Sequence, residues 1–113
     1  MDREHVRRIC LAQRGATEVI QWGDALVFKV AGKMFAMMNL EPAPTALCFK
    51  CTSEEFADLS ERPGCVPAPY LARAEWIALE TLDALPAREI EQLLRRSYAL
   101  VVAKLPKKAR EAL

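Results

Sequence analysis

The fold is decided by the stretch Trp22-Gly23-Asp24-Ala25-Leu26-Val27-Phe28-Lys29-Val30-Ala31-Gly32-Lys33-Met34-Phe35-Ala36-Met37-Met38-Asn39-Leu40. It predicts two apolar strands joined at Ala31-Gly32-Lys33, because Gly32 can adopt the positive φ that a tight hairpin turn requires. Alternation divides the first strand into two faces, one with Leu26, Phe28 and Val30 and the other with Val27, Lys29 and Ala31. A hairpin alone is marginally stable in water, so we expect further strands and at least one helix against it.

The composition is that of a globular domain. The chain has 113 residues, of which 52% are hydrophobic and 27% charged, and we expect a single domain over residues 1–113. No apolar segment is long enough to act as a signal or to span a bilayer, which predicts a cytoplasmic protein with no membrane partner. In that reducing compartment the four cysteines are expected to be thiols.

The segment before the hairpin predicts a helix and a strand. Asp2 can cap a helix that ends at Gly15, and residues 17–21 are rich in β-branched side chains, as is typical of a strand. A turn at Gly23-Asp24 then leads into the hairpin.

The rest of the chain predicts two more strands and two more helices. After a proline-containing loop at 41–44 we expect a strand over 45–51, and then a helix over Ser53 to Leu59, because Thr52 and Glu55 match a capping box. Residues 66–71 are expected to be stiff and extended, lying over the surface. Residues 75–82 predict the fifth strand.

A long amphipathic helix is predicted from Pro86 to Pro106, followed by a short basic tail. Its apolar stripe recurs every three or four residues, which makes it the best candidate to cover the sheet. The stripe consists of Ile90, Leu93, Leu94, Ser97, Tyr98, Val101 and Leu105. The predicted fold is therefore a two-layer α+β domain, with an antiparallel five-stranded sheet covered by the N- and C-terminal helices.

Three segments together resemble the MmcQ/YjbR family of small bacterial proteins. They are Trp22-Gly23 with residues 27–30 and 32–36; Pro67-Ala68-Pro69-Tyr70-Leu71 with Trp76-Ile77; and Ser97-Tyr98 with Leu100-Val101 and residues 104–108. The resemblance implies a CyaY-like fold of order α-β(4)-α-β-α and a double-wing DNA-binding motif. The chain departs from the commoner family pattern at Asp24-Ala25-Leu26, where many relatives have a His-Pro-like pair.

No set of residues indicates catalysis, a metal or a cofactor. Cys48 and Cys51 lie three apart in a predicted strand, so their side chains should point to opposite faces, and a zinc site needs four converging ligands. Cys51 precedes a predicted helix whose dipole could lower the pKa of its thiol. His5 is the only histidine and is expected to be a surface or partly packed side chain. We therefore predict a non-enzymatic binding protein.

Basic side chains give the first hypothesis for a partner, which is nucleic acid. The chain is nearly neutral, with a net charge of +1, but its two ends are basic and its middle is acidic. Lysines flank the hairpin turn, Lys50 lies in the next strand, and further cations crowd the last helix and tail. The predicted phosphate contacts are Lys29, Lys33, Arg96, Lys104, Lys107 and Lys108. An ordinary solvated surface would explain the same residues.

Aromatic side chains give the alternative, a module that binds a protein or a small ligand. Trp22, Tyr70 and Trp76 could line a groove, since amphipathic rings suit ligand contacts. Trp76 and Tyr98 fall on apolar-periodic elements and could equally be core. An apolar pocket would favour this alternative, whereas a basic face spanning hairpin and helix would favour DNA.

Overall fold

The central hairpin forms where the sequence predicts it. In the computed structural model, which describes residues 1–113, the hairpin consists of β2 (Ala25–Val30) and β3 (Lys33–Asn39). The two turn residues, Ala31 and Gly32, both have positive φ, at 50° and 78°. Such a turn matches the twist of the two strands that it joins.

The hairpin lies within a sheet of six strands rather than the predicted five. The strand order is β1-β2-β3-β4-β6-β5, and all neighbours are antiparallel. The strands outside the hairpin are β1 (Ala16–Gln21), β4 (Leu47–Lys50), β5 (Cys65–Pro67) and β6 (Trp76–Leu79). The unpredicted strand is β5, which includes Val66 and Pro67 of the segment expected to lie over the surface; these two residues pair with β6 instead. Its Pro67 is tolerated because β5 is an edge strand.

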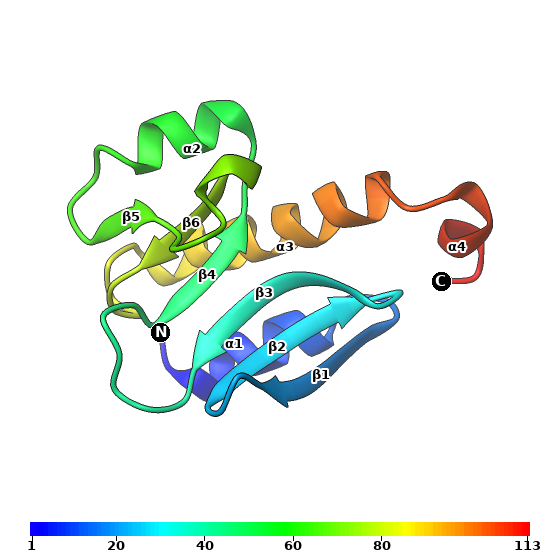
Figure 1. The fold of residues 1–113 in the computed structure, drawn as a ribbon, viewed down its shortest axis with the longest axis horizontal. Coiled ribbons are helices and arrows are strands. Elements are labelled where there is room, and N and C mark those ends of the chain that lie inside the picture. Colours follow the sequence, from blue (N-terminus) through cyan, green and yellow to red (C-terminus); the bar gives the residue numbers. More distant parts are fainter.

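Helices cover one face of the sheet, which we call the helix-covered face. Figure 1 shows α3 (Ala87–Ala103) running behind the strands, with α1 (Arg3–Leu11) beside it. Their apolar stripes join the strands in a core of 21 buried residues. α2 (Ser53–Leu59) begins with the predicted capping box of Thr52 and Glu55. None of the helices has the length and apolar character that a membrane span requires.

The C-terminal end differs from the prediction. The long helix ends at Ala103 instead of continuing to Pro106, and Pro106 begins a short helix, α4 (Lys107–Glu111), in place of the predicted tail. Pro106 lacks an amide hydrogen, so it suits a helix start as well as it suits a helix stop. A proline at this position is therefore compatible both with the end of the long helix and with the start of α4.

Ser97 links two strands at the point where their pairing stops. β3 and β4 pair only over Ala36–Met38 and Leu47–Phe49, and beyond that the two halves of the sheet separate (Figure 1). The Ser97 hydroxyl donates to the carbonyl of Phe35 at 2.6 Å and accepts from the amide of Lys50 at 2.9 Å. It is the one fully buried polar side chain of the core, and it satisfies two backbone groups that the ladder leaves free.

Candidate functional site

The face of the sheet away from α1 and α3 is apolar along one complete row of strands. Register places one residue from each strand side by side across this face: Val19, Val27, Met37, Cys48, Ala78 and Val66. An antiparallel sheet with helices on one side usually shows polar residues to water on the other. An apolar second face therefore has to be covered by the chain itself or by a ligand.

The chain covers only one half of this second face. The segment between β5 and β6, which includes the 3-10 helix η1 (Ala72–Ala74), brings Ala68, Leu71 and Trp76 against Cys48 and Ala78. Over β2 and β3 a groove of about 550 Å³ remains open. We call it the aromatic groove, and its lining consists of Trp22, Ala25, Met34, Met37, Asn39, Pro69, Tyr70 and Leu71. Its volume is in the range of ligand-binding pockets.

A β-bulge supplies the floor of the aromatic groove. Between Phe28 and Lys29 the register of the hairpin shifts, so that Phe28 pairs with Ala36 but Lys29 pairs with Met34. Phe35 and Ala36 consequently both enter the helix-covered core. Met34 and Met37 are three residues apart, yet both line the groove. Regular alternation would send these methionines to opposite faces, and the bulge brings them to the same one.

Trp22 and Tyr70 stand at the groove with their side chains in solvent. Trp22 is 69% exposed and Tyr70 is fully exposed. Both residues have a left-handed backbone, with φ of 50° and 65°, a conformation that is uncommon for bulky residues and costs energy. Two large aromatic side chains in strained, exposed positions beside the same groove are typical of a binding site rather than of a core. Trp76, the third aromatic residue predicted for a groove, is buried beneath this face.

Lysines gather in a second hollow, of about 390 Å³, which we call the lysine hollow. Its basic residues come from three distant elements: Lys33 begins β3, Lys50 ends β4, and Lys104 follows α3. No acid lines the hollow, and its other lining residues are Met34, Trp76, Val101, Leu105 and Pro106. Trp76, predicted for a groove with Trp22 and Tyr70, thus lines the hollow and not the aromatic groove. Lys50 Nζ donates to the carbonyl of Ala74 at 2.9 Å, which holds that ammonium group in place.

The aromatic groove and the lysine hollow meet at Met34, which lines both. Lys29 is the direct partner of Met34 in the register and lies on the same face. Of the six predicted phosphate contacts, Lys33 and Lys104 therefore line the hollow and Lys29 lies next to it. Lys50, noted from the sequence as a cation in the next strand, joins them.

The remaining predicted cations lie elsewhere. Arg96 Nη1 donates to Glu55 Oε2 at 3.1 Å, and Glu55 is also the capping residue of α2. Lys107 lies 3.8 Å from Glu111 within α4, and Lys108 is exposed on that helix. No residue of the basic N-terminus lines the hollow, and Arg7 there forms a bidentate ion pair with Glu18.

The cysteines are buried and are not activated. Cys48 lies on the second face and Cys51 in the helix-covered core, so the predicted divergence of the pair is confirmed. Burial, with nearby Glu55 and Glu75, raises the pKa of the Cys51 thiol to about 12. The helix dipole, which could have lowered this pKa, does not do so, because desolvation of the thiolate is the largest influence on it. No cluster of three His, Cys, Asp or Glu side chains could hold a metal ion.

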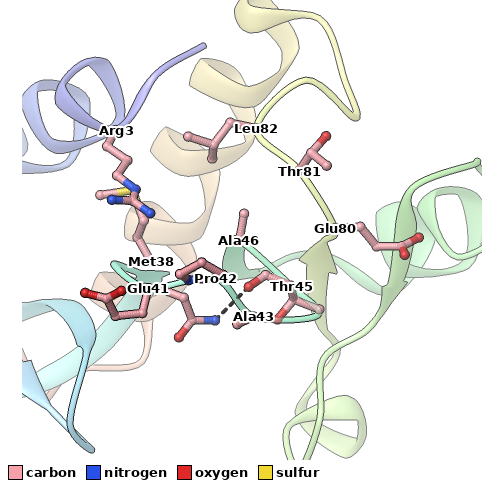
Figure 2. A pocket seen from close by; sticks show the side chains of 11 residues that line it. Arg3, Met38, Glu41, Pro42, Ala43, Thr45, Ala46, Glu80, Thr81 and Leu82 are labelled. Atoms are coloured by element: carbon pink, nitrogen blue, oxygen red, sulfur yellow. Dashed lines mark hydrogen bonds between the residues drawn. The ribbon is translucent and has the colours of Figure 1, made fainter.

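A third pocket, of about 260 Å³, lies where the 41–46 loop meets β6 and α1. Figure 2 shows Arg3 reaching from α1 toward this loop, which the Asn39 amide fastens by donating to the carbonyl of Thr45 at 2.7 Å. The lining carries both Glu41 and Glu80 as well as Arg3. Its mixed charge distinguishes this pocket from the groove, whose lining is uncharged, and from the hollow, whose only charged lining residues are lysines.

The sequence reasoning missed Met34, Met37, Pro69 and Leu71 as groove residues. One signal was present, since Ala25–Val30 is apolar at both odd and even positions apart from Lys29. A strand that is apolar on both faces is usually buried on both. The second face could thus have been identified as apolar, but its open half could not.

The fold and part of the sequence match known proteins. The sequence model of the family described as YjbR matches residues 11–100. The crystal structure of a Deinococcus radiodurans protein with a domain of type DUF419 has a TM-score of 0.84 at 28% identity, covering 95% of this chain and 83% of that one. A protein from Pseudomonas syringae has a TM-score of 0.73 at 23% identity, covering 88% and 98%. No curated protein matches the chain.

Proposed function

This chain belongs to the YjbR family, and from that premise we propose that it is a non-enzymatic protein that binds nucleic acid through the lysine hollow. The observation that carries the proposal is the convergence of Lys33, Lys50 and Lys104, which are far apart in the sequence, around a hollow with no acid in its lining. Lys29 extends the cationic surface on the neighbouring strand.

Charge balance explains why these lysines are the better candidates. Phosphate binding depends on cations that are free to replace condensed counterions. Arg7, Arg96 and Lys107 already have carboxylate partners, whereas no ion pair involves Lys29, Lys33, Lys50 or Lys104. A binding surface at the hollow therefore needs no existing ion pair to break.

The aromatic groove supports a second candidate function, a module that binds a protein or a small ligand. Six of its eight lining residues are hydrophobic, and apolar grooves of this size are common ligand sites. This candidate predicts binding that changes little with salt. Nucleic-acid binding predicts that affinity depends steeply on salt, so a measurement of affinity against salt concentration separates the two candidate functions.

Buried cysteines that form no disulfide are compatible with a cytoplasmic location, where nucleic acid is accessible. All four thiols are free and buried, which suits a reducing compartment. We accordingly propose a cytoplasmic location.

The test is a fluorescence anisotropy titration with labelled duplex and single-stranded DNA across a range of salt concentrations. We expect affinity to fall steeply as salt rises, with a slope that decreases when Lys33, Lys50 and Lys104 are all replaced by Gln. Affinity that does not change with salt would overturn the proposal.

A matched control removes the same amount of charge away from the hollow. Arg3, Arg8 and Arg88 are exposed and form no ion pair, and only Arg3 lines a pocket. Replacing these three with Gln should change the salt slope less than replacing the three lysines. Equal effects of the two triple variants would show that net charge, and not the hollow, attracts the DNA.

A further inference from the structure

We propose that the aromatic groove receives an unpaired nucleobase, so that the protein binds single-stranded nucleic acid in preference to duplex. This inference rests on the function proposed above and specifies the form of the ligand. It assigns the groove and the lysine hollow to one continuous site.

The groove and the hollow share a lining residue. Met34 belongs to both the groove and the hollow, and Lys29 lies directly opposite it in the hairpin. A ligand in the groove is thus next to several ammonium groups. Its chemistry should combine an apolar part with negative charge, and a nucleotide strand provides both at short intervals.

Two aromatic residues at the groove are exposed to solvent. Trp22 and Tyr70 expose their rings at the groove instead of burying them, and the backbone at both positions is left-handed. Ring faces in solvent are suited to stacking with bases, which every base can do regardless of sequence. The floor beneath them, which includes Met34 and Met37, is apolar and deformable.

The charge of the groove and the hollow favours an anionic ligand. No acidic residue lines the groove or the hollow. Two other depressions of the surface contain acids: Glu41 and Glu80 line one, and Glu55, Asp58 and Glu89 line another. A fifth depression, lined by Gln92, Arg95, Arg96 and Ala99, has no acid in its lining, but both of its arginines are paired with carboxylates, Arg95 with Glu91 and Arg96 with Glu55. The apolar aromatic surface is therefore placed where the protein would attract an anion.

The geometry of a duplex is the reason why we expect the groove to prefer single-stranded nucleic acid. In a duplex the faces of the bases are stacked on each other and only their edges reach a protein. Trp22 and Tyr70 could then contact sugar and phosphate but could not stack. An unpaired strand exposes the faces, as single-strand binding proteins require.

The experiment compares a labelled oligothymidylate with a DNA hairpin of the same number of phosphates, by anisotropy at one low salt concentration. Four proteins are compared: wild type, the double variant Trp22→Ala and Tyr70→Ala, the double variant Trp22→Phe and Tyr70→Phe, and the triple lysine variant. We expect wild type to bind the single strand about tenfold more tightly. The alanine pair should lose about tenfold on the single strand and little on the hairpin, while the phenylalanine pair should retain affinity.

A second measurement reports directly on Trp22. In a Trp76→Phe background, Trp22 is the only tryptophan, and its emission should be quenched by the oligothymidylate but not by the hairpin. Trp76 lines the lysine hollow and would also respond to a bound strand. If Trp76→Phe does not fold, the wild-type protein is therefore compared with Trp22→Phe, and the quenching that this variant loses is assigned to Trp22.

The outcomes separate the two proposals. Equal affinity for single strand and hairpin, with both falling steeply in salt, would overturn the inference and leave nucleic-acid binding intact. The same holds if the alanine pair binds the single strand as wild type does. No salt-dependent binding to either DNA would overturn both. A change in Trp22 emission on addition of an acidic amphipathic peptide, with no binding of either DNA, would assign the groove to a protein partner and overturn both proposals.

Discussion

The two faces of the sheet use the same kinds of residue for different purposes. On the helix-covered face, Phe35 lies within 6.4 Å of the Phe28 ring and 5.5 Å of the Tyr98 ring, measured between centroids, and 21 residues are buried together. On the second face the buried cluster has four residues, and Trp22 and Tyr70 are left in solvent. The comparison indicates that one face holds the fold together and the other is available for binding.

The largest expected difference between the faces is in the cost of removing an aromatic ring. Phe35→Ala should lower the free energy of unfolding by about 3–5 kcal/mol, because it leaves a cavity in a close-packed core. Tyr70→Ala should change it by less than about 0.5 kcal/mol, since Tyr70 is fully exposed. Urea denaturation of both variants measures this difference. Similar losses would contradict the division of roles between the faces.

A smaller effect is expected at Ser97, which joins the two halves of the sheet from the helix-covered side. Ser97→Ala leaves the carbonyl of Phe35 and the amide of Lys50 without this partner, so it should cost about 1–3 kcal/mol. Ser53→Ala is the control, because the Ser53 hydroxyl is exposed and donates to Glu75 at the surface. Equal stability of these two variants in urea would show that the Ser97 hydroxyl does not hold the strands together.

A change of opposite sign is expected at Trp22 on the second face. Trp22→Gly should raise the free energy of unfolding by about 1 kcal/mol, because glycine adopts a left-handed backbone without steric cost. Trp22→Ala retains the Cβ and should not be stabilising. The two variants are compared by thermal unfolding. If glycine and alanine behave alike, the backbone at Trp22 carries no strain, and exposure alone would distinguish it from the core aromatics.

The buried thiols of the two faces are expected to have the smallest effect on stability near neutral pH. Burial raises the pKa of Cys10, on the helix-covered face, to about 12, and that of Cys48, on the second face, to about 11. In the unfolded chain a thiol loses its proton at about pH 8.5, so stability should be constant below about pH 7.5 and fall as pH rises through about 8.5 and above.

Alkylation by iodoacetamide at neutral pH tests whether the faces open to the same degree. Both thiols should react slowly, since the thiolate is the reactive form and is rare in the folded state. We expect Cys48 to react before Cys10, because only the short segment over residues 68–75 covers it. Faster reaction of Cys10 would mean that the helix-covered face is the less stable one.

The local elements were predictable because their signals lie within a few residues. The Ala31-Gly32 turn, the Thr52 and Glu55 capping box and the stripe of the long helix each depend on short-range geometry, and each forms. The edge strand β5 was missed, since it has only three residues and includes Pro67. Short edge strands exist only through their partner, which here is β6.

The candidate site was predictable only in part. The sequence identified Trp22 and Tyr70, and it identified Lys29, Lys33 and Lys104, but it placed Arg96 and Lys107 with them. Arg96 pairs with Glu55 of α2 across 41 residues of chain, which leaves no local pattern. Lys107 lies near Glu111, four residues on in α4, and this local pair was missed because α4 was predicted to be a tail.

By itself the sequence determined every strand except β5 and every α-helix except α4, together with the apolar stripe of the long helix, because alternation by two and by 3.6 follows from backbone geometry alone. The tertiary structure decided which apolar surface stays open. The bulge opposite Phe28 and Lys29 turns both Met34 and Met37 toward the groove, and the path of residues 68–75 covers one half of that face and not the other. Both depend on contacts between distant segments, which no residue pattern along the chain can specify.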